Sequence, residues 1–156
     1  MPVIVGQKAP DFTLYDSDKN KVSLSEQRGD NVLLLFFPFA FSKVCTAELC
    51  SVRDNMHRYN AIRAKVYGIS VDSLYTLAKF KTEENLNFTL LSDFNKEASH
   101  SYGAIYETFG YGMKGVSKRA AFVIDSEGFI QYAEILESAS EQPEFSLVIK
   151  KLEELV

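Results

Sequence analysis

Residues 32–45 read VLLLFFPFAFSKVC, and they carry the strongest signal for the fold of this chain. Residues 32–37 are continuously apolar, and the run ends at Pro38, which cannot donate a backbone hydrogen bond to a neighbouring strand. A short, unbroken apolar run is typical of a strand that is buried on both faces of a sheet. We therefore expect a central strand here, followed by a loop that leads to Cys45.

A helix is expected after this loop, because apolar residues then recur at steps of three or four. They place one apolar face on the helix, formed by Leu49, Val52, Met56, Tyr59 and Ile62. Cys45 consequently falls in the first turn, beside backbone N–H groups that have no partner within the helix. The positive end of the helix dipole also lies at this turn, and both features favour a thiolate at Cys45.

The elements on either side of this strand and helix alternate in type. Residues 12–15 and 22–24 flank an Asx-rich turn and predict an amino-terminal hairpin. Downstream, the pattern predicts a strand at 65–71, Asp72 or Ser73 as an N-cap, and a helix at 74–85. A short segment near Leu90, a brief helix around Ala98 and a glycine-containing loop at 103–115 follow. The last predicted elements are paired strands at 120–124 and 129–135 and a helix at 144–155. This order predicts an α/β fold with a mixed central sheet flanked by helices, and it matches the thioredoxin fold.

Length and composition indicate one globular domain over residues 1–156. The net charge of −4 comes without any Lys/Arg-rich block, so we expect no nucleic-acid partner. Because the sequence has no leader pattern and no apolar run of membrane-spanning length, we expect a cytoplasmic protein without a membrane partner. Two cysteines are too few for a disulfide framework, which makes them candidates for chemistry.

A four-residue pattern resembles the peroxiredoxin family. The spacing Pro38-x-x-x-Ser42-x-x-Cys45 is similar to that family's proline, threonine or serine, and peroxidatic cysteine. Arg119, in the stretch KRAAFVID at 118–125, resembles the arginine that the family carries on a late strand. The likeness extends from Val5 to the carboxyl-terminal helix. Residues 36–50 read FFPFAFSKVCTAELC. This stretch is similar to the AhpE-like and bacterioferritin-comigratory-protein-like branches of the AhpC/TSA family.

This resemblance implies a thiol peroxidase that reduces hydrogen peroxide and alkyl hydroperoxides. The Cys45 thiolate would attack one peroxide oxygen, release water or an alcohol, and become a sulfenic acid. Ser42 would hydrogen-bond near the thiolate and the peroxide, and Arg119 would stabilise the thiolate and the charge on the leaving oxygen. Pro38 would shield the sulfur from water. Glu48 resembles the family glutamate that orients the active-site arginine.

The same resemblance implies a thiol reductant, which would be thioredoxin, glutaredoxin or a low-molecular-weight thiol. A homodimer is compatible with it: the aromatic residues Tyr106, Phe109 and Tyr111 either cover a dimer interface or pack locally. We expect no cofactor and no metal. Cys50 and His57 lie nearly in line on the helix, but no second pair completes a tetrahedral set of zinc ligands.

Cys50 has two interpretations. It is either a resolving cysteine, which attacks the sulfenic acid to form a disulfide, or a small apolar residue that fills the helix core. Five positions along a helix separate two Cα atoms by about 8.6 Å, beyond the ~7 Å limit of an unstrained disulfide. Resolution would therefore require the first turns to unwind in each cycle. We favour the resolving role.

Each motif residue also has a simpler interpretation when it is taken alone. Pro38 would end a strand, Ser42 would cap a helix, Cys45 would be inert packing, and Arg119 would form an ordinary ion pair. The combined spacing favours catalysis over these alternatives.

Two other functions use the same residues. A thioredoxin-like disulfide oxidoreductase needs a Cys-x-x-Cys pair, whose first cysteine would stand where Ser42 is. A peroxide-sensing redox switch would use the same oxidation of Cys45, and only catalytic turnover distinguishes it from an enzyme.

Overall fold

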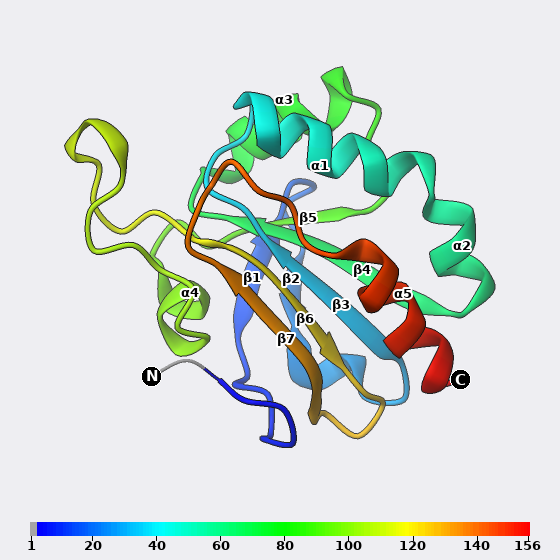
Figure 1. Cartoon of the computed structure of the whole chain (residues 1–156). Coiled ribbons are helices and arrows are strands. Elements are labelled where there is room, and N and C mark those ends of the chain that lie inside the picture. Colours follow the sequence, from blue (N-terminus) through cyan, green and yellow to red (C-terminus); the bar gives the residue numbers. More distant parts are fainter. Residues whose placement is uncertain (1–2) are drawn as a thin grey trace.

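The computed structural model describes residues 3–156 of the chain, which are built around a seven-stranded mixed sheet (Figure 1). Its strand order is β2-β1-β5-β4-β3-β6-β7. The strands are β1 Thr13–Asp16, β2 Lys21–Ser23, β3 Asn31–Phe36, β4 Ala64–Ser70, β5 Thr89–Ser92, β6 Arg119–Ile124 and β7 Ile130–Leu136. Strands β3, β4 and β5 run parallel, whereas β1, β2, β6 and β7 pair antiparallel with their neighbours. The predicted mixed sheet and amino-terminal hairpin are confirmed.

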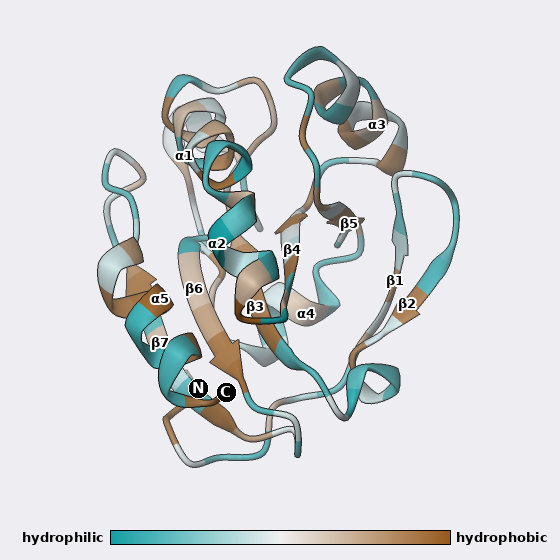
Figure 2. Ribbon diagram, turned by 90° about the vertical axis from the view of Figure 1, so that its right-hand side faces the viewer, coloured by the Kyte–Doolittle hydropathy of each residue, from teal (hydrophilic) through white to brown (hydrophobic). Residues whose placement is uncertain are grey.

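Helices cover both faces of this sheet. They are the 3-10 helix η1 Leu24–Gln27, α1 Lys43–Asp54, α2 Met56–Ala61, α3 Leu74–Glu83, α4 Glu97–Ser101, the 3-10 helix η2 Gly110–Gly112, and α5 Phe145–Glu154. Apolar side chains of α1, α2, α3 and α5 pack on one face, while α4 and the amino-terminal segment pack on the other. Figure 2 shows hydrophobic residues concentrated on the central strands. Within residues 3–156, no helix is long and apolar enough to cross a bilayer.

The central strand β3 is buried on both faces, as the sequence predicts. Leu33 and Leu35 point into the core beneath the four larger helices, whereas Leu34 and Phe36 point into the core on the opposite face. All four side chains are fully shielded from solvent. Pairing with β4 and β6 sets the register of β3, in which Leu33 lies opposite Val66 and Val123. It therefore fixes where the chain leaves the sheet on its way to Cys45.

The helix that carries Cys45 is shorter than its apolar pattern predicts. The prediction of one helix through Ile62 was wrong, because α1 ends at Asp54 and α2 begins at Met56. Asn55 separates them: its backbone N–H bonds to the carbonyls of Ser51 and Val52, and its side chain donates to Ser51 at 2.9 Å. The apolar stripe nevertheless stays in the core across this break, with buried side chains at Leu49, Val52, Met56 and Tyr59.

The three parallel strands end at the same edge of the sheet. The loops after β3, β4 and β5 therefore lie side by side there, which brings residues 37–42, 71–73 and 93–96 together. Of the two expected caps for α3, the structure selects Ser73, whose hydroxyl accepts a bond from the Thr76 N–H at 3.2 Å.

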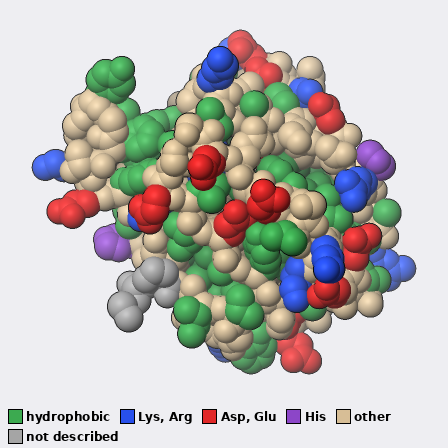
Figure 3. All heavy atoms as spheres, viewed as in Figure 1, with side chains coloured by type: hydrophobic (Ala, Val, Ile, Leu, Met, Phe, Trp, Pro, Cys, Tyr) green, Lys and Arg blue, Asp and Glu red, His purple; other side chains and the backbone are tan. Residues whose placement is uncertain are grey.

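A loop between α4 and β6 projects from the body of the molecule (Figure 1). It contains η2, in which Tyr111 is fully exposed and Met113, just after it, is partly exposed. Figure 3 shows hydrophobic side chains at the tip of this projection.

Candidate active site

The loop between β3 and α1 places Cys45 at the sheet edge. Pro38 is buried directly after the strand, and Phe41 adopts a left-handed backbone conformation with φ of 69°. Ser42 occupies the N-cap position of α1, so Cys45 is the third residue of the helix and lies in its first turn as predicted. The cysteine side chain has no exposed surface.

Strand pairing brings Arg119 to the same place. Arg119 begins β6, where the next residue, Ala120, pairs with Phe36 at the end of β3. Its Nη2 donates to the Cys45 sulfur at 3.3 Å, and its Nη1 donates to Glu48 Oε1 at 2.5 Å. The sequence therefore identifies three side chains that the fold joins into one buried cluster.

The Arg119 guanidinium is held in a nearly closed environment. Only 1% of its side-chain surface is exposed, and Nη2 also donates to the Ala139 carbonyl at 2.8 Å. Burial without partners is costly for a charge, so these three acceptors are what keep the guanidinium in place. Two buried atoms still lack a hydrogen-bond partner, the Arg119 Nε and the Glu48 Oε2.

The electrostatics of the cluster depend on Glu48. Burial raises the pKa of Glu48 from 4.5 to about 7, and the charge of Arg119 and its hydrogen bond oppose this rise. On the other side of the guanidinium, Nη2 donates to the Cys45 sulfur. The arginine therefore bridges the buried Glu48 carboxyl and the Cys45 thiol.

The Ser42 hydroxyl bonds neither the Cys45 sulfur nor the N–H groups at the start of α1, the two roles that the sequence offers for it. Its hydroxyl donates to the Phe39 carbonyl at 2.8 Å, and it makes no side-chain bond to the helix N–H groups. Its own carbonyl accepts bonds from the Thr46 N–H and Thr46 hydroxyl, at 2.9 and 2.8 Å. The serine thus closes the turn before α1 and leaves the N–H groups of the first helical turn free of side-chain caps.

Aromatic rings flank the loop on both sides. The Phe39 ring contacts Phe109 from the projecting loop, with centroids 6.1 Å apart, and Phe41 packs on Phe80 at 5.1 Å. Phe109 also packs against Tyr106, whose hydroxyl donates to the Glu137 carbonyl. Within this chain, Tyr106 and Phe109 therefore make local contacts with the active-site loop and its surroundings.

Cys50 lies apart from this cluster, although it belongs to the same helix. Its thiol donates to Glu84 Oε1 at 3.5 Å, and the side chain is partly exposed. Both cysteines are free thiols in this structure. Burial raises the pKa of Cys50, and the Glu84 hydrogen bond raises it further. In the described part of the chain, no group of three or more His, Cys, Asp or Glu side chains is arranged to hold a metal ion.

Sequence reasoning missed two groups at the site. Asp72 was considered only as a helix cap, yet its carboxylate accepts a bond from the Ala40 N–H in the active-site loop at 2.8 Å. The convergence of parallel strand ends could have indicated this contact. The second group, the Ala139 carbonyl on Arg119, has no signal in the sequence because any residue carries a carbonyl.

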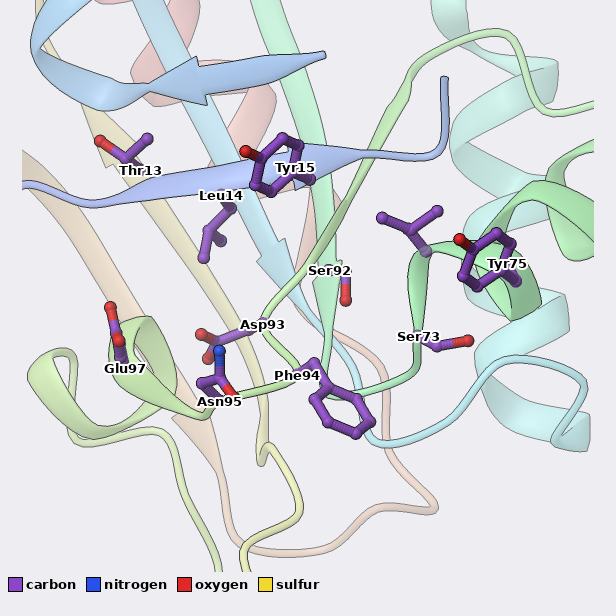
Figure 4. A pocket seen from close by; sticks show the side chains of 11 residues that line it. Thr13, Leu14, Tyr15, Ser73, Tyr75, Ser92, Asp93, Phe94, Asn95 and Glu97 are labelled. Carbon is purple, nitrogen blue, oxygen red and sulfur yellow. The ribbon is translucent and has the colours of Figure 1, made fainter. Parts of the chain in front are cut away.

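A separate hollow of about 450 Å³ opens beyond β5 (Figure 4). Its walls include the exposed aromatic rings of Tyr15, Tyr75 and Phe94. None of the six residues that the sequence predicts for the active site lines it.

Comparisons with known proteins identify the family and agree with this fold. The sequence pattern of the AhpC/TSA family matches residues 5–133. A putative peroxiredoxin of Mycobacterium tuberculosis (strain ATCC 25618 / H37Rv) is 41% identical over 131 residues, which cover 83% of this chain and 83% of the relative. Peroxiredoxin Bcp of Escherichia coli (strain K12) is 37% identical over 133 residues, which cover 84% and 85% of the two chains. The crystal structure of peroxidoxin BcpB from Mycobacterium tuberculosis superposes with a TM-score of 0.86 at 27% identity, covering 97% of each chain.

The sheet order and the structural relatives define a thioredoxin-like α/β fold, which confirms the predicted fold class. The family match and the peroxiredoxin relatives identify the chain as a thiol peroxidase, and its fold places a cysteine at the start of a helix. The chain is a member of the AhpC/TSA family, and it resembles the Bcp peroxiredoxins within it.

The buried Glu48 generates a prediction about stability and pH. Its pKa of about 7 in the folded chain exceeds its ordinary value of 4.5, so the folded state binds this proton more tightly than the unfolded state. The contribution of Glu48 to the free energy of unfolding must then fall as pH rises from about 4.5 to about 7. Glu48→Gln keeps an oxygen for Arg119 but cannot titrate. Urea unfolding across this window should show a smaller fall for Glu48→Gln than for the wild type, and parallel curves would contradict the assignment.

Proposed function

We propose that the chain reduces hydrogen peroxide and alkyl hydroperoxides with Cys45 as the peroxidatic cysteine. The observation that carries this proposal is the 3.3 Å contact between the Arg119 guanidinium and the Cys45 sulfur in the first turn of α1. The thiolate forms a bond to one peroxide oxygen while the O–O bond breaks. The second oxygen leaves with the electron pair, takes up a proton and departs as water or an alcohol, and the sulfur becomes a sulfenic acid.

The other site residues take supporting tasks in this proposal. Arg119 already donates to the sulfur, so the same guanidinium is placed to stabilise charge on the departing oxygen. Glu48 orients the guanidinium through its short bond to Nη1. The Ser42 hydroxyl turns from the Phe39 carbonyl to the bound peroxide, and the buried Pro38 keeps water from the sulfur.

We assign the resolving role to Cys50. Both cysteines lie in α1, whose regular geometry holds their Cα atoms about 8.6 Å apart, so α1 must open before a disulfide forms. Cys50 is held by Glu84 while the helix is intact, and this contact disfavours its thiolate. Opening of α1 frees the thiol from Glu84. Cys50 then attacks the Cys45 sulfenic acid, forms the S–S bond and releases water.

The catalytic cycle requires a thiol reductant, for which we propose thioredoxin, glutaredoxin or a low-molecular-weight thiol. A homodimer through the exposed tip of the projecting loop, where Tyr111 is uncovered, is part of the same proposal. One domain over residues 1–156 and a cytoplasmic location stay predictions of the sequence.

Peroxide turnover tests the proposed activity. With hydrogen peroxide and dithiothreitol, the wild type should consume peroxide far beyond protein stoichiometry. Cys45→Ser should lose this activity, because a serine hydroxyl hardly ionises where a thiol does. Cys50→Ser is the matched control, since it removes the other thiol and should stay active with this small reductant. Rapid consumption by Cys45→Ser would reject the assignment of Cys45.

Mass spectrometry after one equivalent of peroxide tests the role of Cys50. The wild type should lose two hydrogens through an intramolecular Cys45–Cys50 disulfide, whereas Cys50→Ser should gain one oxygen as a sulfenic acid. Amide exchange between residues 46 and 53 should quicken in the oxidised wild type while β3 stays protected, because only α1 has to open. A lasting sulfenic acid in the wild type, with no disulfide, would make Cys50 a packing residue.

A further inference from the structure

We propose that Asp72, two residues beyond the end of β4, is a positioning residue for peroxide reduction: its carboxylate holds the loop 38–42 in the geometry that presents Ser42 and the first turn of α1 to the substrate. This inference rests on the proposed function of Cys45. In this proposal Asp72 positions the loop 38–42. Neither the Pro38–Ser42–Cys45 motif nor the contact between Cys45 and Arg119 does so.

The carboxylate is itself held in a fixed orientation. Asp72 Oδ2 accepts bonds from the Ala40 N–H at 2.8 Å and from the Ser70 hydroxyl at 2.7 Å. The Asp72 N–H donates back to the Ser70 hydroxyl at 3.2 Å, and the Asp72 carbonyl accepts the Ser92 hydroxyl at 2.6 Å. Figure 4 shows Ser92 and Ser73 on the neighbouring segments that end β5 and begin α3. The acceptor for Ala40 is therefore anchored to two strand ends.

The backbone of the loop 38–42 has few hydrogen bonds to the rest of the chain. Within residues 3–156, the Ala40–Asp72 bond is the one hydrogen bond that joins the backbone of residues 38–42 to a part of the chain outside residues 38–46. The remaining bonds of this loop are local, from the Ser42 hydroxyl to Phe39 and from Thr46 to the Ser42 carbonyl. The Phe37 N–H bonds the Ile69 carbonyl at 2.9 Å and holds the chain to β4 just before the loop. Beyond that point, the position of residues 38–42 relative to the sheet depends on Asp72 and on side-chain packing.

The backbone conformation of the loop requires such a tie. Phe41 follows Ala40 directly and has φ of 69°, a conformation that non-glycine residues adopt only when their surroundings impose it. The Asp72 bond fixes the chain just before Phe41, and the Ser42 hydrogen bonds fix it just after. Without Asp72, the loop can relax away from this conformation and carry Ser42 with it.

Loss of the tie should affect peroxide attack more than the ionisation of Cys45. The charged and polar groups next to the Cys45 sulfur are the Arg119 guanidinium and the first turn of α1, and neither hydrogen-bonds to Asp72. Peroxide attack additionally needs the substrate aligned with the sulfur, and misplacement by about 1 Å is enough to cost about 10²-fold in rate. A positioning role therefore predicts a separation of these two properties.

The experiment uses the Cys50→Ser background, in which Cys45 is the one remaining cysteine. Stopped-flow oxidation with hydrogen peroxide gives the second-order rate constant, and the pH profile of iodoacetamide alkylation reports the ionisation of Cys45. Asp72→Ala should slow peroxide oxidation by about 10- to 10²-fold and leave the midpoint of the alkylation profile unchanged. Asp72→Asn should restore the rate to within about threefold, because its amide oxygen still accepts the bond from Ala40.

Ser73→Ala is the matched control, because it removes the cap of α3 next to Asp72, where the hydroxyl accepts the 3.2 Å bond from the Thr76 N–H, and leaves the hydrogen bonds of Asp72 and of the loop in place. It should lose stability with an unchanged rate constant. If Asp72→Ala does not fold, Ser70→Ala decides: it removes the hydroxyl that orients the carboxylate and should slow oxidation severalfold.

Three outcomes would overturn the inference. They are an unchanged rate in folded Asp72→Ala, or in Ser70→Ala where that variant decides; equal losses in Asp72→Asn and Asp72→Ala; and a shifted alkylation midpoint that accounts for the slower rate. Absence of oxidation in the parent protein would instead reject the proposed function of Cys45.

Discussion

The donation from Arg119 to the Cys45 sulfur is the interaction on which the site depends. A cysteine at a helix start lies near the positive end of the helix dipole. This protein adds a full positive charge, with the Arg119 Nη2 at 3.3 Å from the Cys45 sulfur. That charge comes from a residue 74 positions away, so it is available only when β6 has paired with β3 in the observed register. Pairing of β6 with β3 is therefore what brings the guanidinium to the Cys45 sulfur.

Burial makes this arrangement both effective and demanding. With Cys45, Glu48 and Arg119 all shielded from solvent, their interactions are stronger than they would be in water. The same burial penalises every charge that lacks a partner, so Glu48 and the Ala139 carbonyl are needed to hold the guanidinium. The site combines this rigid interior with a surface loop, which is tied to the sheet through the Ala40 N–H.

Local patterns in the sequence predict most of the fold. The apolar run at 32–37 identifies the central strand, and the Asx-rich turn identifies the hairpin, because each signal depends on neighbouring residues alone. The break at Asn55 was missed because the apolar stripe continues in phase across it, while the side-chain bond to Ser51 ends the helix. Long-range contacts are different: Arg119 was identified through its resemblance to a family, and the contacts of Asp72 and Ala139 emerged only from the folded chain.

Single-turnover oxidation of Cys45 at saturating thiolate measures whether Arg119 activates this cysteine toward peroxide. Arg119→Ala should slow peroxide attack by about 10²–10³-fold, as expected for a lost donor to the departing oxygen. Lys118→Ala is the control, because this neighbouring cation pairs with the exposed Glu137 and should leave the rate unchanged. Equal rate constants for folded Arg119→Ala and the wild type would contradict the account.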